Sequence, residues 1–437
     1  MAFSGNTVPY KTEWIKAYQE THYKQPVFPI FADQKFADVL AAGATIKWSY
    51  DADIDAPELG TDGAYSVENR TVTDETLTVD QLPSATFRIP GPQRIQDHRP
   101  TQAKWSAKAM NRIFWKMDAR MLSTMKTNAA STVDAGDLGG SSGTAITVTS
   151  GNAAAIFAAA RRKLRNQNVI YDENKKWSGY TKLDAMAKYP AAAIPAELEE
   201  QVLLATGFKP GDLGDQVLTR GYMNMLFGFN TFVSTTLPMT FLFTIASGNL
   251  SNGDTLVIAG LTYTFKTGSV TTAGDILIGG SATLTGDNIV TALASPYTDV
   301  STTFKAFNRS TLTVAQRMVA DGLAYVAATN ASGAVTVTLI GLGSQSVTTT
   351  SATGTVSAQA VHAIFGTSQS IALVLQRFPE LTVSGDIIGN GSTGGYVARD
   401  FVTWTLAGWK CFLTQTKQLV GVSIASSAFS APNNVYN

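Results

Sequence analysis

The chain has few charges, few histidines and a single cysteine among its 437 residues. Charged residues make up 15% of the sequence, against roughly 25% in a typical soluble domain, and the formal net charge is zero. A neutral chain lacks the overall basic footprint of a nucleic-acid-binding protein. The lone Cys411 excludes an intramolecular disulfide, and its strand-like surroundings favour a buried, unreactive thiol.

Long hydrophobic runs are also missing. The longest apolar stretches are far too short to span a bilayer, so no contact with a membrane is expected. The first residues show no charged segment followed by an apolar one, so no secretory signal is expected either. A chain of 437 residues has room for about two or three domains.

Motifs for catalysis are absent as well. The three histidines, His22, His98 and His362, stand in separate segments with no carboxylate or serine at motif spacing. Neither a nucleophile elbow nor an HExxH motif is present. We therefore predict no catalytic residue, no metal, no cofactor and no enzymatic activity.

Two weaker motifs have simpler explanations. Gly389, Gly391 and Gly394 match the GxGxxG spacing, but a strand-like run follows them where a dinucleotide site needs a helix, so we predict a turn. The acidic segment 51–62 has aspartates at positions 1, 3, 5 and 12 of a calcium-loop spacing. Alanine occupies position 6, where the calcium loop requires glycine, so a solvated acidic tip is the favoured interpretation.

What the sequence does contain is an abrupt change of composition in its middle. Between Phe243 and Val361 only nine of 119 residues are charged, and Thr, Ser, Gly, Ala and Val dominate. The flanking segments are mixed and well charged. This pattern predicts a β-rich domain inserted into a host domain and able to fold by itself. Within it we expect a hairpin over 248–267 with its turn at Asn-Gly-Asp, a strand near 333–343, and short helices near 287–293 and 315–323.

The host segments show clear periodicities. Alternating residues predict strands at 45–48, 75–82 and 85–90, which together indicate a long two-stranded loop over 45–92. Apolar residues spaced by three and four predict a helix of about 28 residues over 101–128. A second helix is expected over 152–166, a third beginning at Pro195, and two strands near 400–414 and 417–426.

Charges of opposite sign gather on two of these elements. Residues 51–80 contain nine acids and one base, whereas residues 99–126 contain seven bases and one acid. An acidic loop that projects from the body reaches the long helix of a neighbouring copy more easily than its own. The candidate contacts pair Asp51, Asp53, Asp55, Glu58 and Asp62 with Lys104, Lys108, Arg112, Lys116 and Arg120. Ordinary solvated faces, or contact of the basic helix with nucleic acid, are the alternatives.

The order of these parts resembles the major capsid proteins of tailed bacteriophages, which have the HK97-type fold. The resemblance rests on an N-terminal arm, an extended loop, a long spine helix and the segment GFNTFVSTTLP (228–238), which is similar to a strand of those coats. It implies an α+β fold in six parts. These are an N-terminal arm (1–43), an extended hairpin loop (44–97), a spine helix (98–130), the first part of the peripheral and axial domains (131–242), the inserted β-rich domain (243–362) and the last part of the axial and peripheral domains (363–437).

The resemblance also implies a function. Such a protein assembles with itself as pentamers and hexamers into an icosahedral shell around the phage genome, in the virion and, during assembly, in the host cytoplasm. Its implied partners are a scaffolding protein, a portal, decoration proteins and, without sequence specificity, the packaged double-stranded DNA. A tail-tube subunit or a surface adhesin is the alternative, and an enzyme with a β-rich accessory domain is a third.

Overall fold

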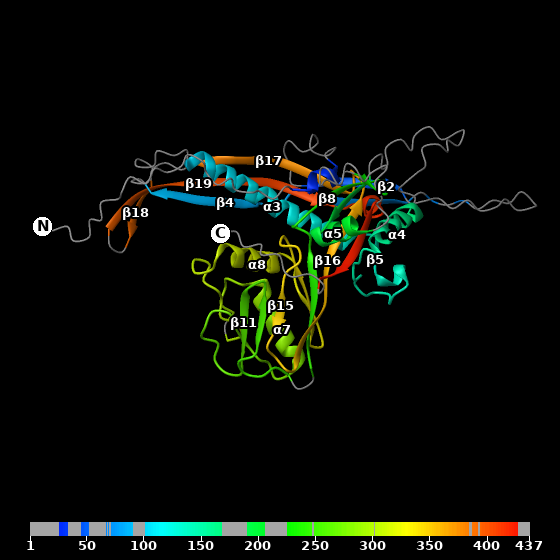
Figure 1. The fold of residues 1–437 in the computed structure, drawn as a ribbon. Coiled ribbons are helices and arrows are strands. Elements are labelled where there is room, and N and C mark those ends of the chain that lie inside the picture. The colour runs from blue at the N-terminus through cyan, green and yellow to red at the C-terminus, as the bar shows by residue number, and fades with distance from the viewer. Residues whose placement is uncertain are drawn as a thin grey trace, which may run out of the picture.

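The computed structural model describes residues 26–33, 45–51, 67, 69, 71–90, 101–167, 190–205, 225–246, 249–300, 302–383, 387–391 and 394–426. Helices and sheets are mixed along the chain, which confirms the predicted α+β class. Figure 1 shows an elongated upper body built around long strands and a long helix, with a rounded domain below it.

The upper body contains a sheet of five strands. Its order is β1-β17-β19-β18, and β4 pairs with β19 as well. The strands are β1 (Ala32–Asp33), β4 (Ser84–Pro90), β17 (Ile371–Val383), β18 (Ile387–Gly391) and β19 (Gly394–Lys410). The glycines of the GxGxxG match join β18 to β19 as an antiparallel hairpin, with Gly391 opposite Gly394. The predicted turn is therefore confirmed, and the strand after it excludes a dinucleotide-binding helix at this place.

The helix α3 (Thr101–Asn128) runs along this sheet, as Figure 1 shows, and has the bounds that the sequence predicts. Its apolar stripe is fully buried at Met117, Met121, Leu122 and Met125, because these residues pack into the main hydrophobic core. Trp105, nearer the start, is half exposed and lies against Phe87 of β4, with ring centroids 5.9 Å apart. The stripe thus fixes α3 to the body over most of its length.

A second sheet of nine strands joins the body to the rounded domain. Its main order is β13-β14-β9-β16-β6-β8-β7, and β20 pairs with β16 and with β5. The strands are β5 (Ser131–Val133), β6 (Ala191–Ile194), β7 (Met225–Leu226), β8 (Phe229–Val233), β9 (Met239–Ile245), β13 (Thr329–Ala331), β14 (Ala334–Leu339), β16 (Gly354–Gly366) and β20 (Leu419–Ala425). The helices α4 (Ala153–Asn166) and α5 (Ala196–Leu204) lie close to the predicted positions. Short helices α1 (Phe28–Phe31), η2 (Ala135–Leu138) and α9 (Leu413–Thr416) lie in the connections.

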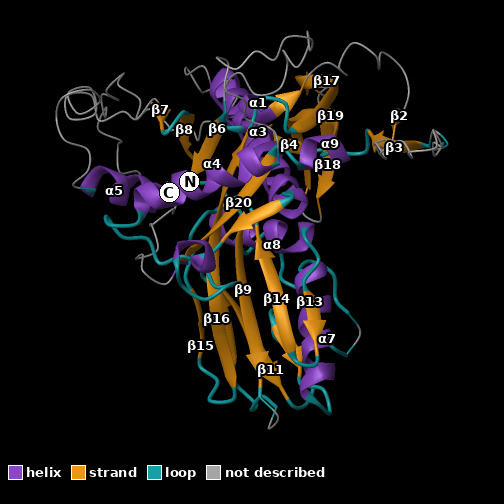
Figure 2. Cartoon of the chain, turned by 90° about the vertical axis from the view of Figure 1, so that its right-hand side faces the viewer, coloured by secondary structure: helices purple, strands orange, loops and turns teal. Residues whose placement is uncertain are grey.

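The low-charge segment forms the rounded domain. It has its own four-stranded sheet and two helices, and its core is continuous with that of the body. The elements are β10 (Thr255–Ile258), β11 (Leu261–Lys266), β12 (Asp275–Leu277), α7 (Ala282–Ala294), α8 (Val314–Tyr325) and β15 (Val347–Thr349). The antiparallel pair β9 and β16 runs from the body into this domain, as Figure 2 shows. The range 243–362 as a self-folding unit stays a prediction.

The expected turn at Asn-Gly-Asp forms, with the Asp254 amide donating to the Ser251 carbonyl at 3.1 Å, but it does not join β10 to β11. The hairpin β10–β11 turns at Ala259 and Gly260, not at Asn252, Gly253 and Asp254. Both turn residues have positive φ, 49° and 80°, as a two-residue hairpin turn of this hand requires. The Asn-Gly-Asp segment instead leads into β10, where the Gly253 amide donates to the Phe265 carbonyl.

The extended loop begins as a two-stranded hairpin. β2 (Thr45–Asp51) pairs with β3 (Val72–Thr78), as predicted, whereas β4 leaves the hairpin and joins the sheet of the body. Figure 2 shows the hairpin projecting on one side of the molecule, while α4 and α5 lie on the opposite side. At the base of the hairpin, Ile46 and Leu77 are buried against the body.

Candidate functional site

The acidic candidates lie almost entirely outside the described residues. Asp51 is exposed at the end of β2, whereas Asp53, Asp55, Glu58 and Asp62 fall outside the described ranges. Along the part of the hairpin that is described, Trp48 and Val72 are 41% and 55% exposed. The hairpin therefore presents apolar as well as acidic groups to the surroundings.

The basic candidates on α3 do not share one environment. Lys108 is exposed, and the side chain of Lys104 lies outside the described part of the chain. Arg112, Lys116 and Arg120 are half-buried, because the helix α8 of the inserted domain lies over this part of α3. Of the basic candidates whose side chains are described, only Lys108 is exposed.

The contacts between α3 and α8 explain this burial. The Arg120 guanidinium lies 4.3 Å from the ring centroid of Tyr325 and donates to Gln81 Oε1 at 3.0 Å. Arg112 Nη1 approaches Met318 Sδ at 2.9 Å. Burial lowers the pKa of Lys116, and the charge of Arg120 lowers that pKa further, while Asp321 opposes both effects. These basic groups therefore hold the inserted domain on the spine helix.

Asp321 organises the facing surface of α8. Its carboxylate accepts two hydrogen bonds from Arg309, at 2.8 and 3.0 Å, and one from the Tyr297 hydroxyl at 2.9 Å. Burial alone would raise the pKa of Asp321, but the hydrogen bonds from Arg309 outweigh it and the pKa is lowered. The carboxylate is thus held ionised beside Lys116.

A buried carboxylate on α3 ties three segments together. Asp118 is fully buried, and its Oδ1 accepts the backbone amides of Val27 and Phe28, each at 2.7 Å. Its Oδ2 accepts the hydroxyl of Thr236, which in turn contacts Ser234 Oγ at 2.7 Å. In the sequence, Asp118 stands out only as the one acid among the bases of the helix. The segment 228–238, on which the resemblance rests, supplies both hydroxyls.

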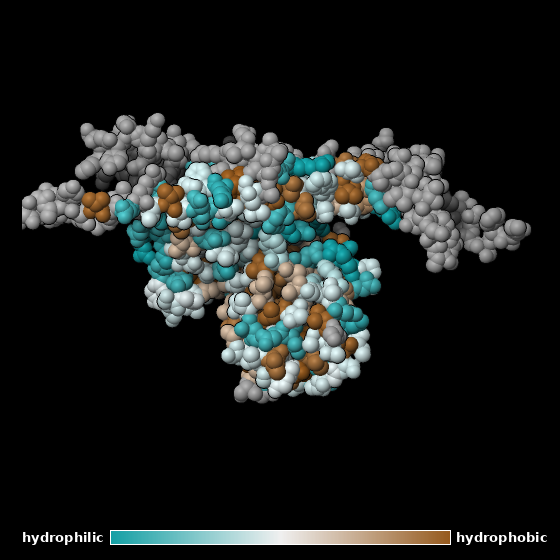
Figure 3. Space-filling model, turned by 180° about the vertical axis from the view of Figure 1, so that it is seen from behind, coloured by the Kyte–Doolittle hydropathy of each residue, from teal (hydrophilic) through white to brown (hydrophobic). Residues whose placement is uncertain are grey.

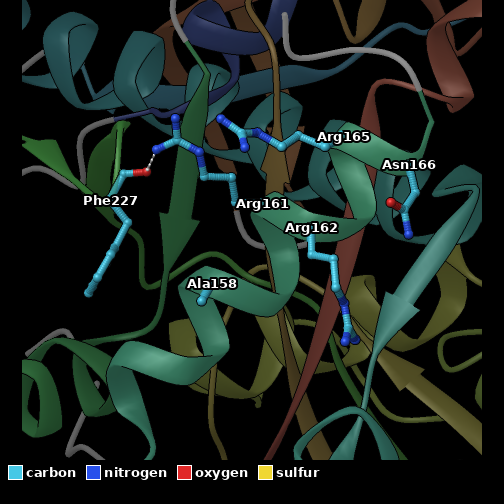
Figure 4. Close-up of a pocket in the computed structure, with 6 residues that line it drawn as sticks. All are labelled: Ala158, Arg161, Arg162, Arg165, Asn166 and Phe227. Atoms are coloured by element: carbon cyan, nitrogen blue, oxygen red, sulfur yellow. Dashed lines mark hydrogen bonds between the residues drawn. The ribbon is translucent and has the colours of Figure 1, made fainter. Parts of the chain in front are cut away.

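A second basic surface lies on α4, and sequence analysis assigned it no role. A hollow of about 320 Å³ lies beside it, and Figure 4 draws the residues that line the hollow, which are Ala158, Arg161, Arg162, Arg165, Asn166 and Phe227. The apolar face of α4 is buried at Ile156, Phe157, Ala160 and Leu164, so the basic residues are turned outward. The run RRKLR was visible in the sequence, but nothing there indicated that its arginines surround a hollow.

The arginines of the hollow differ in their partners. Arg161 Nη1 donates to the Phe227 carbonyl at 2.5 Å, and Arg162 pairs with Asp137 at 2.9 Å. Arg165 is exposed and has no acidic partner within the described part of the chain. In Figure 4 the side chains of Arg161 and Arg165 extend toward the same side of α4, and Arg162 extends away from them.

The turn between β7 and β8, beside the hollow, contains two residues with positive φ. Phe227 and Gly228 join β7 to β8 with φ of 50° and 82°. A Cβ atom at position 228 would lie 2.6 Å from Arg161 Nη1, so glycine is required for the close approach of the guanidinium. Phe227 itself is 40% exposed at the rim of the hollow.

Two of the residues considered above as reactive groups, His362 and Cys411, are described by the structure, and both are buried. His362 is buried between Thr240 and Ser423, and burial raises the pKa of the Cys411 thiol to about 12. Within the described ranges, no three metal-binding side chains come together. None of the described helices is long and apolar enough to cross a membrane. On the face shown in Figure 3, hydrophobic and hydrophilic residues are interspersed over the rounded domain.

Comparison with known proteins gives a match by structure alone. No protein-family model and no curated protein sequence matches the chain. A chain from a structure of Mycobacterium phage Che8 superposes with a TM-score of 0.52 at 11% identity, covering 96% of this chain and 97% of that one. The capsid structure of cyanophage P-SCSP1u gives 0.48 at 10% identity, with 96% and 93% covered. The capsid of cyanophage Pam1 gives 0.46 at 10% identity, with 97% and 99% covered.

The likeness to the Che8 chain shows a shared fold over nearly the whole length of both chains. The fold is the HK97-type fold that the order of parts in the sequence predicts, with a β-rich insertion. At 11% identity the likeness concerns the fold and not individual residues.

Proposed function

We propose that this chain is the major capsid protein of a tailed bacteriophage, a structural subunit that assembles with copies of itself into a closed shell. The observation that carries the proposal is the fold, shared from end to end with a phage protein chain at a TM-score of 0.52. A fold by itself does not fix a function, and the projecting hairpin β2–β3 is the independent support.

The finer proposal is that the subunits form pentamers and hexamers of an icosahedral shell around the phage genome. A scaffolding protein, a portal and decoration proteins are the proposed partners, and the packaged duplex contacts basic groups without sequence specificity. The virion is the proposed location, and the host cytoplasm the place of assembly.

We further propose that neighbouring copies contact one another through opposite charges. The acidic set is Asp51, Asp53, Asp55, Glu58 and Asp62, and the basic set is Lys104, Lys108, Arg112, Lys116 and Arg120. Because Arg112 and Arg120 already contact α8 and Lys116 is half-buried, Lys108 is the member of the basic set best placed to meet a second copy. Exposed ion pairs are screened by salt, so such contacts would weaken as ionic strength rises.

Electron microscopy of the purified chain, with and without a crowding agent and with co-expressed scaffolding protein, tests the proposal. Closed or partly closed shells of uniform curvature are the expected result. Tubes or discrete rings would instead identify a tail protein. Monomers that bind glycans and do not assemble under any of these conditions would favour an adhesin.

A further inference from the structure

The hollow on α4 has the chemistry of a site for an anion. Arg161 and Arg165 line it together, and neither has a carboxylate partner within the described ranges. Two guanidinium groups beside one hollow repel each other, and an oxyanion between them removes that repulsion. Guanidinium groups bind carboxylates through paired hydrogen bonds, and Arg165 is free to make them.

The charge balance of the chain indicates where the anion comes from. The formal net charge is zero, yet the segment 51–62 contains five acids and no base. The basic groups that balance this excess must therefore lie elsewhere. On the spine helix, Arg112 and Arg120 contact α8 of the same chain and Lys116 is half-buried beside Asp321. In the described part of the chain, the hollow on α4 brings Arg161, Arg162 and Arg165 together, and Arg165 is exposed.

The positions of the two surfaces then decide whether the contact lies within or between chains. Figure 2 shows the β2–β3 hairpin, from which the acidic segment continues, on the side opposite α4. Since the described end of the hairpin and α4 lie on opposite sides, the proposed contact is one between two copies in head-to-tail order. Head-to-tail contacts that repeat around an axis close into rings.

We infer that the α4 hollow binds carboxylates from the acidic segment 51–62 of a second copy of this chain. Arg165 is the anion-binding residue, and Arg161, fixed by the Phe227 carbonyl, completes the site. The inference rests on the proposed shell function, because it names the receptor for a contact between subunits.

A peptide of residues 51–62 tests binding without assembly. Labelled peptide is titrated with the full chain at low salt, and fluorescence anisotropy is measured. Arg165→Glu replaces an attractive pair with a repulsive one, so the peptide should bind at least about tenfold more weakly. Lys417→Glu, at an exposed position outside both basic surfaces, is the control and should alter the affinity less than about twofold. Lys108→Glu tests the spine helix as the receptor instead.

Three results would overturn the inference. They are equal affinity for the wild-type chain and Arg165→Glu, a loss confined to Lys108→Glu, and no binding of the peptide at all. A short DNA duplex is titrated in parallel. If Arg165→Glu abolishes binding of the duplex while the peptide does not bind, the hollow is a phosphate site instead.

A charge exchange in the full chain tests the contact itself. Arg165→Glu should fold normally, since the side chain is exposed, but should assemble poorly by electron microscopy. Combining it with Asp53→Arg should restore shells. Normal assembly of Arg165→Glu would reject the contact, and so would poor assembly that Asp53→Arg does not restore. Shells formed by the wild-type chain would leave the proposed function intact in that case, so the two failures are distinguishable.

Discussion

Asp118 is the residue on which the junction between the spine helix and its neighbours depends. A fully buried carboxylate is costly unless its oxygens are satisfied, and here two backbone amides and a hydroxyl satisfy them. The amides belong to the start of α1, and the hydroxyl belongs to the connection between β8 and β9. The Asp118 side chain thus links three segments that lie far apart in the sequence.

Asp118→Asn should therefore destabilise the folded subunit strongly. The amide group of asparagine turns a donor toward one of the existing donors, and we expect the free energy of unfolding to fall by about 3 kcal/mol. Chemical denaturation measures the change. Asp287→Asn, at an exposed position on α7, is the matched control and should change it by less than about 0.5 kcal/mol. Equal effects at the two positions would show that the buried hydrogen bonds of Asp118 contribute nothing to the free energy of unfolding.

His362 gives the subunit a pH dependence. Burial, aided by the charge of Lys126, lowers the pKa of His362 to about 3. In the unfolded chain the group titrates near 6.5, so between these values the unfolded state binds more protons and stability falls as pH falls. Going from pH 7.5 to 5.5, this histidine alone should remove about 1.4 kcal/mol from the free energy of unfolding.

Denaturation of the wild-type chain and of His362→Gln at both pH values isolates this effect. Glutamine keeps a hydrogen-bonding group between Thr240 and Ser423 but does not titrate. The variant should be less stable at both pH values and should lose about 1.4 kcal/mol less on acidification. The same loss in both proteins would assign the pH dependence to other groups.

At the scale of elements, the spine helix α3 could be predicted from the sequence, whereas its contact with α8 could not. Residues 101–128 were predicted with their observed bounds because the apolar stripe and its period are local properties of the sequence. The cover by α8 is a tertiary contact across nearly 200 residues, as between Arg112 and Met318. No local pattern signals such a contact. The basic groups of the spine therefore looked like a free surface in the sequence.

The hairpin β10–β11 also shows that local sequence signals do not decide the structure by themselves. Asn-Gly is a strong turn signal, and a turn does form there before β10, yet the hairpin between β10 and β11 turns at Ala259 and Gly260. The register is decided by burial, since Leu256, Ile258 and Leu261 must all face the core. A prediction from turn-forming residues alone therefore gave the wrong positions for the two strands of the hairpin.

Gly341 tests how closely the inserted domain fits the spine helix. It has φ of 83°, and a Cβ atom there would lie 3.1 Å from both Ala119 and Trp115 of α3. Gly341→Ala should cost about 1 to 2 kcal/mol for the backbone conformation and roughly as much again for displacing α3. Thermal or chemical denaturation of the full chain measures the loss.

Gly253→Ala is the control for this substitution. Gly253 has φ of 93° but nothing lies within 4 Å of its Cβ position, so only the cost of the backbone conformation, about 1 to 2 kcal/mol, should appear. If both variants lose the same stability, the inserted domain does not fit closely against α3 at this point.

For the whole molecule, the acidic hairpin matters more to assembly than to folding. The hairpin strands β2 and β3 pair with each other, and Ile46 and Leu77 are buried at their base. They also contact the body through Trp48, whose ring lies 6.1 Å from that of Phe412, and through Glu75, which accepts the Leu413 amide, whereas Asp51 at the end of β2 is exposed. An isolated hairpin of this kind gains stability by docking on something else. A neighbouring copy is the partner that the proposed shell provides.

Reversing the charges of Asp51, Asp53 and Asp55 to Lys should therefore separate folding from assembly. Asp51 is exposed at the end of β2, and Asp53 and Asp55 follow it in the sequence, so we expect the free energy of unfolding to change by less than about 1 kcal/mol. Assembly depends on the summed attraction of several pairs between copies, so shells should become rare by electron microscopy and sedimentation. Replacing the same residues with Asn should give an intermediate yield, because repulsion is absent. Normal shells from the Lys variant would reject acidic docking both on the spine helix and on α4.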